Sequence, residues 1–238
     1  CKASTYKRPA LVFIPGYLTE RPDSDEFEQW TTNIKYFAQK YDFASYGMYW
    51  PSGNLLDIID TDFFSTVSVF STALNGLEAW KEALKRADQI AEQANKWISQ
   101  LRRPVILVGH SLGARIVLRS AEYVEENHIL CSFCMAPAVG ASEISFEKVR
   151  RANQYKGAIF YSENDWVLKY IYPLGRTTDD VALGLEFQSQ FQPKYIKGID
   201  VGVFDGEPVY HNTYADICDQ ILSASEVHNS LEMIVRRF

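Results

Sequence analysis

Ser111 is the residue whose type and neighbours point most directly to chemistry. It stands in the run G-H-S-L-G (109–113), after an apolar stretch and before a helical pattern. A serine at a sharp turn from strand to helix exposes its hydroxyl beside the free N–H groups of the new helix. Larger side chains at Gly109 or Gly113 would collide with the crossing backbone. We therefore expect Ser111 to be a nucleophile and the Leu112 N–H to hold an oxyanion; the alternative is an idle serine in a glycine-rich turn.

A serine hydroxyl is a weak nucleophile and needs a base, which points to the histidines downstream. His211 lies in DGEPVYHNTY, a loop expected just after the last strand, where the carboxyl ends of the strands meet. His228 lies in a helical pattern and is expected on a helix surface. His110 is expected to point elsewhere, and His128 precedes a strand on the wrong side of the sheet. His211 is the predicted base.

Asp165 is the predicted acid that would hold the base in the correct tautomer. It follows the expected strand 157–161 by a short loop, at the same edge of the sheet as the serine. Glu163 is the first rival, whereas Asp200 inside the last expected strand and Asp205 just beyond it fit less well. Taken alone, Asp165 could equally be a turn-capping residue before a helix.

Short apolar runs alternate with amphipathic stretches along the chain. Strands are expected at residues 10–14, 43–50, 105–109, 129–135, 157–161 and 199–204. Helical spacing of apolar residues predicts helices at 27–41, 80–101, 114–127 and 142–155, with one or two more within 214–238. Asn75 and Glu78 have the capping-box spacing for the second helix, which Pro104 ends. This alternation predicts an α/β fold, a doubly wound and mostly parallel sheet of about six strands with helices on both faces.

Two segments do not fit the alternation. Residues 51–74 mix apolar side chains with Ser, Thr and Asp, and residues 170–197 separate the fifth and sixth strands. Insertions at strand ends usually shape the ligand crevice in such folds. We expect one domain over 1–238 in which 51–74 is either a lid or acyl pocket, or an irregular segment packed on the core.

With these residues in place, the chain resembles the α/β-hydrolase superfamily over almost its whole length. The six expected strands correspond to the last six of that fold, without its leading antiparallel pair. The resemblance implies that Ser111 is the nucleophile and that the turn after the first strand supplies a second oxyanion donor. That turn reads I-P-G-Y (14–17), in which Gly16 allows close backbone approach and the Tyr17 N–H is the implied donor. The family commonly has His-Gly here, so Pro15 leaves open which N–H points inward.

Three segments resemble more closely a less-studied branch of that superfamily, found also in transmembrane and coiled-coil domain proteins. They are FIPGYLTE, GHSLGAR, and ENDWVL followed by a His-x-x-Tyr stretch. This resemblance implies a serine hydrolase whose substrate is not specified.

Composition excludes several other classes. The 238 residues carry 24 Lys and Arg against 30 Asp and Glu, so the net charge of −6 argues against a nucleic-acid-binding surface. No paired Cys/His spacing indicates zinc, residues 175–180 form an acidic turn rather than a calcium site, and no G-x-G-x-x-G follows the first strand. Arg115 and Arg119, with Glu122 and Glu126, are expected to be surface or interface charges. We expect neither a cofactor nor a metal.

The cysteines and the start of the chain bear on the compartment. Cys131 and Cys134 lie in an apolar run and are expected to be buried structural thiols, so a reducing, cytoplasmic compartment is favoured. No stretch is apolar over the length that a membrane span needs. The first residue is Cys1 rather than Met, which indicates a trimmed chain; a mature lipoprotein with a lipid-bearing Cys1 is the alternative.

Together these observations predict a serine esterase that acts through an acyl-enzyme, with a lipid or acyl ester favoured as substrate. A peripheral contact with a lipid surface is compatible with this interpretation. The alternatives are a thioesterase, amidase or acyltransferase on the same residues, or a binding protein that kept the fold and lost activity.

Overall fold

A parallel six-stranded sheet forms the centre of the molecule. The computed structural model describes residues 8–17, 25–48, 50, 69–126, 128–175, 179–187 and 195–238. In the order β2-β1-β3-β4-β5-β6, every neighbouring pair of strands is parallel. The strands are β1 (Ala10–Ile14), β2 (Ala44–Gly47), β3 (Val105–His110), β4 (Ile129–Met135), β5 (Gly157–Tyr161) and β6 (Ile196–Asp200). The predicted fold class is confirmed, and the strand order is that of the α/β-hydrolase core.

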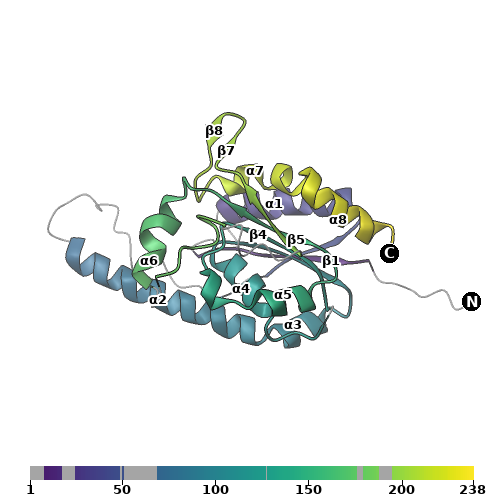
Figure 1. The fold of residues 1–238 in the computed structure, drawn as a ribbon, viewed down its shortest axis with the longest axis horizontal. Helices are drawn as coiled ribbons and strands as arrows, with labels where there is room; N and C mark the ends of the chain where they lie inside the picture. The colour runs from purple at the N-terminus through teal and green to yellow at the C-terminus, as the bar shows by residue number, and fades with distance from the viewer. Residues whose placement is uncertain are drawn as a thin grey trace, which may run out of the picture.

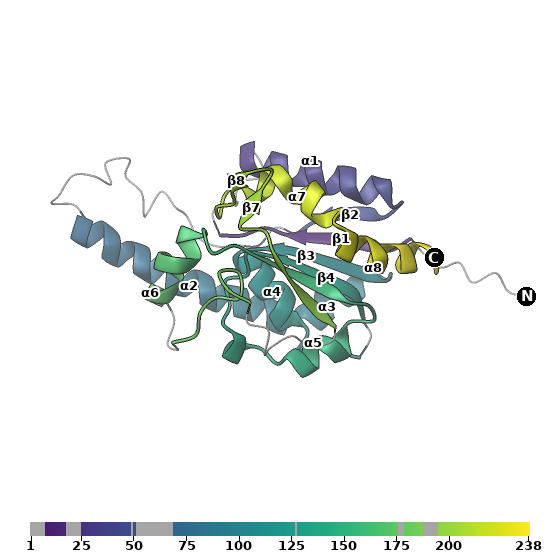
Figure 2. The same cartoon turned by 45° about the horizontal axis from the view of Figure 1, so that its top comes forward.

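Helices cover both faces of the sheet (Figures 1 and 2). One face carries α1 (Asp25–Lys40), α7 (Tyr214–Leu222) and α8 (Ser225–Val235), and the other carries α2 (Val69–Glu92), α3 (Ala94–Gln100), α4 (Leu112–Ser120) and α5 (Phe146–Ala152). Every residue of β1, β3 and β4 is buried, which is why these strands read as continuous apolar runs. On the first face, the rings of Phe13 and Trp30 stack at 4.9 Å between centroids, joining β1 to α1.

The second helix differs from the prediction at both ends. It begins at Val69, so Asn75 and Glu78 lie inside α2 and do not form an N-terminal capping box. It is interrupted at Gln93, where the Gln93 N–H and the Trp97 indole N–H both donate to the Ile90 carbonyl, at 3.1 and 3.3 Å. The capping signal was outweighed because six further residues continue the helix upstream of it.

The last predicted strand, 199–204, is also placed differently. Strand β6 spans Ile196–Asp200, and the following residues form a separate antiparallel hairpin of β7 (Val203–Phe204) and β8 (Glu207–Pro208). Asp205 and Gly206 between them have φ of 51° and 88°, the left-handed geometry of tight hairpin turns, for which Asp-Gly is favoured. The hairpin leaves the sheet directly before the loop that carries His211.

The two predicted insertions are partly regular. Residues 51–68 lie outside the described residues, and 69–74 are the first turns of α2 rather than irregular chain. Within 170–197, a π-helix, η3 (Val167–Ile171), continues into α6 (Tyr172–Gly175), and 196–197 belong to β6. Helix α6 lies beside α2 where α2 reaches past the sheet (Figures 1 and 2). Over the described ranges, no helix combines the length and the hydropathy needed to cross a membrane.

Candidate active site

Three side chains from distant parts of the chain meet at the carboxyl edge of the sheet. Ser111 follows β3, Asp165 follows β5, and His211 follows the β7–β8 hairpin. His211 Nε2 lies 2.9 Å from Ser111 Oγ, and His211 Nδ1 lies 2.7 Å from Asp165 Oδ2. Because a carboxylate only accepts hydrogen bonds, Nδ1 carries the proton and Nε2 is free to accept one from the serine hydroxyl. This Ser111–His211–Asp165 hydrogen-bond chain can raise the nucleophilicity of the hydroxyl.

Ser111 occupies a strained corner that the surrounding backbone holds in place. Its φ of 54° is unusual for a residue with a side chain. The Ser111 N–H donates to the Met135 carbonyl at 3.0 Å, and the Ser111 carbonyl accepts from the N–H groups of Arg115 at 3.1 Å and Ala138 at 3.2 Å. These bonds offset a conformational cost of order 1–3 kcal/mol.

Both glycines of the motif are required by close backbone contacts. A Cβ on Gly109 would lie 2.6 Å from Ala114 Cα, and one on Gly113 would lie 2.0 Å from the Ile14 carbonyl oxygen. The crossing backbone expected from the sequence is thus the start of α4 itself at Gly109, and the end of β1 at Gly113.

Asp165 serves two groups at once. Its Oδ1 accepts the Leu168 N–H at 2.9 Å, so it does cap the following helical segment, and its Oδ2 faces His211. The loop that carries Asp165 is joined to the loop that carries His211, because Ser162 Oγ donates to the Val209 carbonyl at 2.6 Å. Asp165 itself is fully buried. The capping and the acid interpretations of Asp165 are therefore compatible.

The rival residues lie away from this chain of hydrogen bonds. Glu163 and Asp205 are exposed, the latter in the hairpin turn, and Asp200 Oδ1 accepts the Gly202 N–H at 2.8 Å. His228 on α8 contacts Tyr41 and Glu232. His128, which precedes β4, lies 4.0 Å from Glu125.

The turn after β1 runs directly beside Ser111. A Cβ on Gly16 would lie 2.9 Å from Ser111 Cβ, so only glycine fits at this approach. The Pro15 carbonyl accepts the Trp50 indole N–H at 2.9 Å, and the Tyr17 ring packs edge-on against Trp80 at 5.6 Å. Pro15 has no N–H, and Leu112 is the first residue of α4, so the Leu112 and Tyr17 N–H groups remain the proposed oxyanion donors.

His110 is a residue that the sequence analysis set aside. It is only 3 % exposed, and its Nε2–H donates to the backbone carbonyl of His211 at 3.0 Å. Its ring centroid lies 4.8 Å from that of His211, 4.9 Å from Trp30 and 5.7 Å from Tyr214. Burial, and then the charge of His211, lower the pKa of His110 well below its ordinary value, although the bond to the His211 carbonyl opposes this. A histidine at the end of an apolar strand was the signal available in the sequence.

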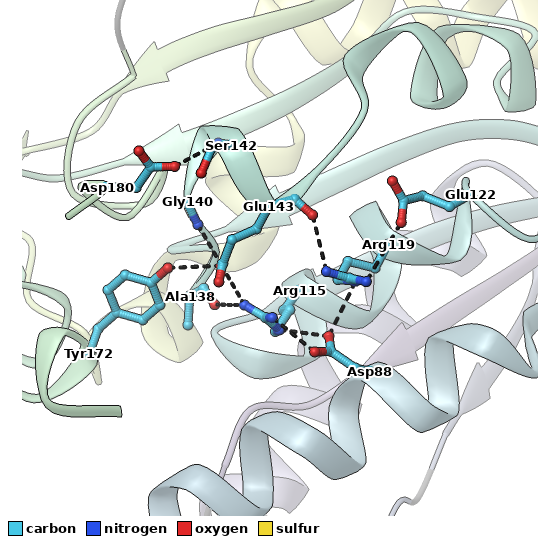
Figure 3. A network of polar contacts seen from close by, with 10 residues as sticks. All are labelled: Asp88, Arg115, Arg119, Glu122, Ala138, Gly140, Ser142, Glu143, Tyr172 and Asp180. Atoms are coloured by element: carbon cyan, nitrogen blue, oxygen red, sulfur yellow. Dashed lines mark hydrogen bonds and ion pairs between the residues drawn. The ribbon is translucent and has the colours of Figure 1, made fainter. Parts of the chain in front are cut away.

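The interpretation of Arg115 as a surface charge is wrong, whereas the half-buried Arg119 does lie beside Glu122, at 3.7 Å. Arg115, whose backbone N–H donates to the Ser111 carbonyl, is 5 % exposed and lies at the centre of a network of polar contacts (Figure 3). Its guanidinium donates to both carboxylate oxygens of Asp88, at 2.8 and 3.0 Å, and to Glu143 Oε2 at 2.6 Å. Glu143 Oε2 also accepts from the Tyr172 hydroxyl at 3.0 Å. Arg119 completes this Arg115 network, donating to the Glu143 carbonyl at 3.0 Å.

The network fixes three segments around the first turn of α4. Burial opposes the charge of Arg115, but the hydrogen bonds to Asp88 and the charges of Glu143 and Asp88 outweigh it and raise its pKa above the ordinary value. Arg115 Nη1 also lies 3.4 Å from the carbonyl of Ala138, whose N–H holds the Ser111 carbonyl. Charge pairs pointing inward were not expected because the partners lie 27 and 28 residues away in sequence.

A cavity of about 460 Å³ adjoins the network, not the hydrogen-bond chain. It is lined by Leu84, Lys85, Asp88, Gln89, Glu92, Arg115, Glu143, Tyr172 and Gly175. This lining is too rich in charge for an acyl chain. Across the described parts of the chain, no group of three or more His, Cys, Asp or Glu side chains is placed to hold a metal ion.

Comparison with known proteins gives a family without an assigned activity. Residues 67–224 match the model of the family described as "Protein of unknown function (DUF726)". No curated protein matches the chain.

Several solved structures are similar at low sequence identity. The esterase Pf2001 of Pyrococcus furiosus is 10 % identical with a TM-score of 0.48, over 95 % of this chain and 83 % of that one. The monoacylglycerol lipase of Paleococcus ferrophilus is 12 % identical with a TM-score of 0.48, over 95 % and 96 % of the two chains. Est1E of Butyrivibrio proteoclasticus is 12 % identical with a TM-score of 0.46, over 98 % and 91 %.

Removal of the Arg115 guanidinium tests the network. Arg115→Met should lower the free energy of unfolding by about 3 kcal/mol or more, because Glu143 would lose its buried guanidinium partner and Asp88 would keep only Arg119, at 3.3 Å. Urea unfolding measures the change. Arg150→Met, which breaks the exposed pair with Glu147, is the matched control and should cost much less. Equal losses in the two variants would contradict a stabilising role for the network.

The lowered pKa of His110 predicts a pH dependence of stability. Below about pH 6.5 the unfolded chain binds a proton at this histidine that the folded chain does not, so acid favours unfolding. The free energy of unfolding of the wild type should fall more steeply than that of His110→Gln, by up to about 1.4 kcal/mol for each pH unit below that point. Urea titrations between pH 4.5 and 7.5 compare the two, since all other titrating groups are shared. Parallel curves would show that His110 takes up its proton in the folded state.

Proposed function

The chain belongs to the DUF726 family, and we propose that it is a serine hydrolase that cleaves a carboxylic ester through an acyl-enzyme. One observation carries the proposal: the unbroken hydrogen-bond chain from Ser111 Oγ through His211 to the buried Asp165. A serine at a strained strand-to-helix corner, within reach of an imidazole that a carboxylate orients, is the arrangement that acyl transfer requires.

The reaction starts with attack of Ser111 Oγ on the ester carbonyl carbon. The hydroxyl proton moves to His211 Nε2, and the Leu112 and Tyr17 N–H groups hold the negative carbonyl oxygen. The tetrahedral intermediate collapses when the leaving alcohol takes the proton from Nε2, leaving the acyl group on Ser111. Water then attacks this ester with His211 as base again, which releases the carboxylic acid and restores the serine.

Asp165 stabilises the imidazolium that forms in each step. Its burial at the end of β5 and its second bond to the Leu168 N–H keep the carboxylate fixed relative to His211 Nδ1. No cofactor enters these steps, since the proton and the acyl group pass only between substrate, Ser111, His211 and water.

The same residues would serve a thioesterase, an amidase or an acyltransferase. These differ in the leaving group and in whether water or another acceptor takes the acyl group. Initial rates on matched esters, thioesters and amides separate the first two from an esterase, and a product that depends on an added alcohol would indicate transfer. A hydrolase-fold protein without activity is the remaining alternative.

A fluorophosphonate probe tests the proposed nucleophile. The wild type should be labelled covalently at Ser111, as seen by intact mass, and Ser111→Ala should not.

His211→Ala should lower ester turnover by about 10³-fold or more, because the hydroxyl loses its base. His228→Ala, a histidine on α8 far from the site, should keep turnover within about twofold and is the matched control. If the fluorophosphonate probe does not label the wild type, the alternative of a hydrolase-fold binding protein without activity would be favoured.

An exposed apolar surface favours a lipid ester as substrate. In the helical segment that follows Asp165, Trp166, Tyr170 and Leu174 are 52 %, 62 % and 58 % exposed. The opposite side of the segment is buried at Leu168 and Tyr172. A helix that is apolar on both sides normally lies inside a protein. When one apolar side is exposed, as here, that side is expected to contact another apolar surface.

The place and charge of this surface support a lipid–water interface. Trp166 is the chain neighbour of Asp165, so a protein partner seated there would crowd the reacting groups, whereas a lipid surface would deliver substrate to them. Trp and Tyr are the residues favoured at membrane interfaces, and the segment's one charge, Lys169, lies 5.7 Å from the Tyr170 ring centroid. We therefore propose peripheral binding to neutral lipid surfaces.

Vesicles of phosphatidylcholine test this surface. The triple variant Trp166→Ser, Tyr170→Ser, Leu174→Ser, made in the Ser111→Ala protein, should bind vesicles about tenfold more weakly than Ser111→Ala alone. Flotation measures binding. Replacing Tyr36, Met233 and Val235, which are 65 %, 48 % and 44 % exposed on α1 and α8, is the matched control and should leave binding unchanged. The same triple in the active protein should hydrolyse a soluble short-chain ester at the unchanged rate. Equal vesicle binding by all variants would contradict the lipid interface.

A further inference from the structure

We propose that His110 is a positioning residue that holds His211 in the orientation needed to act on Ser111. This inference rests on the proposed function and concerns a side chain that hydrogen-bonds to the His211 backbone rather than to the reacting atoms. It follows from the contacts that two consecutive residues make with His211. The His110 side chain binds the His211 backbone, and the Ser111 side chain binds the His211 ring.

The grip is a closed ring of contacts. His110 Nε2–H donates to the His211 carbonyl at 3.0 Å, and the next residue, Ser111, meets the His211 ring through Oγ at 2.9 Å. Residues 110 and 111 are covalently joined, so the backbone and the ring of His211 are both fixed relative to one short segment at the end of β3. The two histidine rings are also in contact, tilted by 45° to each other with centroids 4.8 Å apart. The position of the loop after the β7–β8 hairpin is thereby fixed relative to the end of β3.

His110 is itself fixed from behind. Trp30 of α1 and Tyr214 of α7 are fully buried against its ring, and Trp30 in turn stacks on Phe13 of β1. A ring packed between two helices and a strand has one accessible rotamer, so its N–H points in a constant direction. The positioning bond thus starts from the rigid part of the molecule.

A neutral donor is what this place requires. Among the described residues, the ionisable side chains that pack against the His110 ring are His211 and Tyr214, and neither is a carboxylate that would stabilise an imidazolium here. A second positive charge 4.8 Å from His211 would oppose the imidazolium that forms during acyl transfer. The His110 Nδ1 atom has no hydrogen-bond partner within the described part of the chain, so it offers no path for passing a proton onward. Positioning, rather than proton transfer, is the role that fits.

Two substitutions separate the hydrogen bond from the packing. His110→Phe keeps an aromatic ring and loses the donor, whereas His110→Gln keeps a donor near the position of Nε2 and cannot titrate. With a soluble ester, His110→Phe should lower kcat about 10- to 100-fold and leave KM within about threefold, since misplacing the base affects the chemical step. His110→Gln should retain kcat within about threefold of the wild type. Wild-type kcat in His110→Phe, or equal loss in both variants in proportion to unfolded protein, would overturn the proposal.

Nuclear magnetic resonance of His211 gives an answer that does not depend on turnover. The ¹⁵N shifts of the wild type should report a protonated Nδ1 and an unprotonated Nε2, and His110→Gln should keep them. In His110→Phe they should move toward the averaged values of a ring that exchanges between tautomers. Unchanged His211 signals in His110→Phe would overturn the positioning role even if the protein is an esterase. If the wild type has no ester turnover, or if Ser111→Ala keeps it, only the proposed function fails, and the His211 spectra still test the contacts that His110 and Ser111 make with His211.

Discussion

The structure depends on one backbone constraint, the corner at Ser111 between β3 and α4. Ser111 is held at positive φ there by three backbone hydrogen bonds. Their partners are Met135 and Ala138, at the end of β4 and just after it, and Arg115 in α4. The corner also requires two close backbone approaches. Gly109 lies against the start of α4, and Gly113 lies against the end of β1, where a Cβ would overlap the Ile14 carbonyl. Strain of this kind persists only where the surroundings over-determine it. Here the sheet order places β1 and β4 on either side of β3, so both neighbours contribute to the same turn.

From that corner, the placement of the other two side chains follows by short steps. His211 is reached from β3 by the Ser111 side chain and by His110, and Asp165 is reached from His211 through Nδ1. The loops that carry Asp165 and His211 are also joined to each other by the hydrogen bond from Ser162 to the Val209 carbonyl. Beneath the corner, the Arg115 network binds α2 and the segment after β4 to the first turn of α4. A buried ion pair contributes little net stability compared with apolar packing, so its value here is in fixing which segments meet.

The sequence was sufficient for features whose causes are local. The apolar runs fix the strands because parallel strands are buried on both faces, and the glycine spacing fixes the turn at Ser111 because only that turn needs both glycines. Asp165 and His211 followed from the rule that parallel strands end at one edge. Features set by distant contacts were missed. Arg115 is buried because Asp88 and Glu143 arrive from other segments. Two features that are not set by distant contacts were missed as well: the hairpin turn at Asp205 and Gly206, and the start of α2 upstream of an acceptable capping box.

The segment after β5 shows how these constraints combine in one piece of chain. Asp165 begins it, with one carboxylate oxygen on His211 and the other on the first turn at Leu168. One turn further, the Tyr172 hydroxyl donates to Glu143 and so joins the segment to the Arg115 network under the Ser111 corner. Its outer side carries exposed Trp166 and Tyr170. A displacement of this segment would therefore move Asp165 and the Tyr172 hydroxyl together, because both side chains belong to it. The exposed aromatic side chains and the carboxylate that contacts His211 thus belong to one short helical segment.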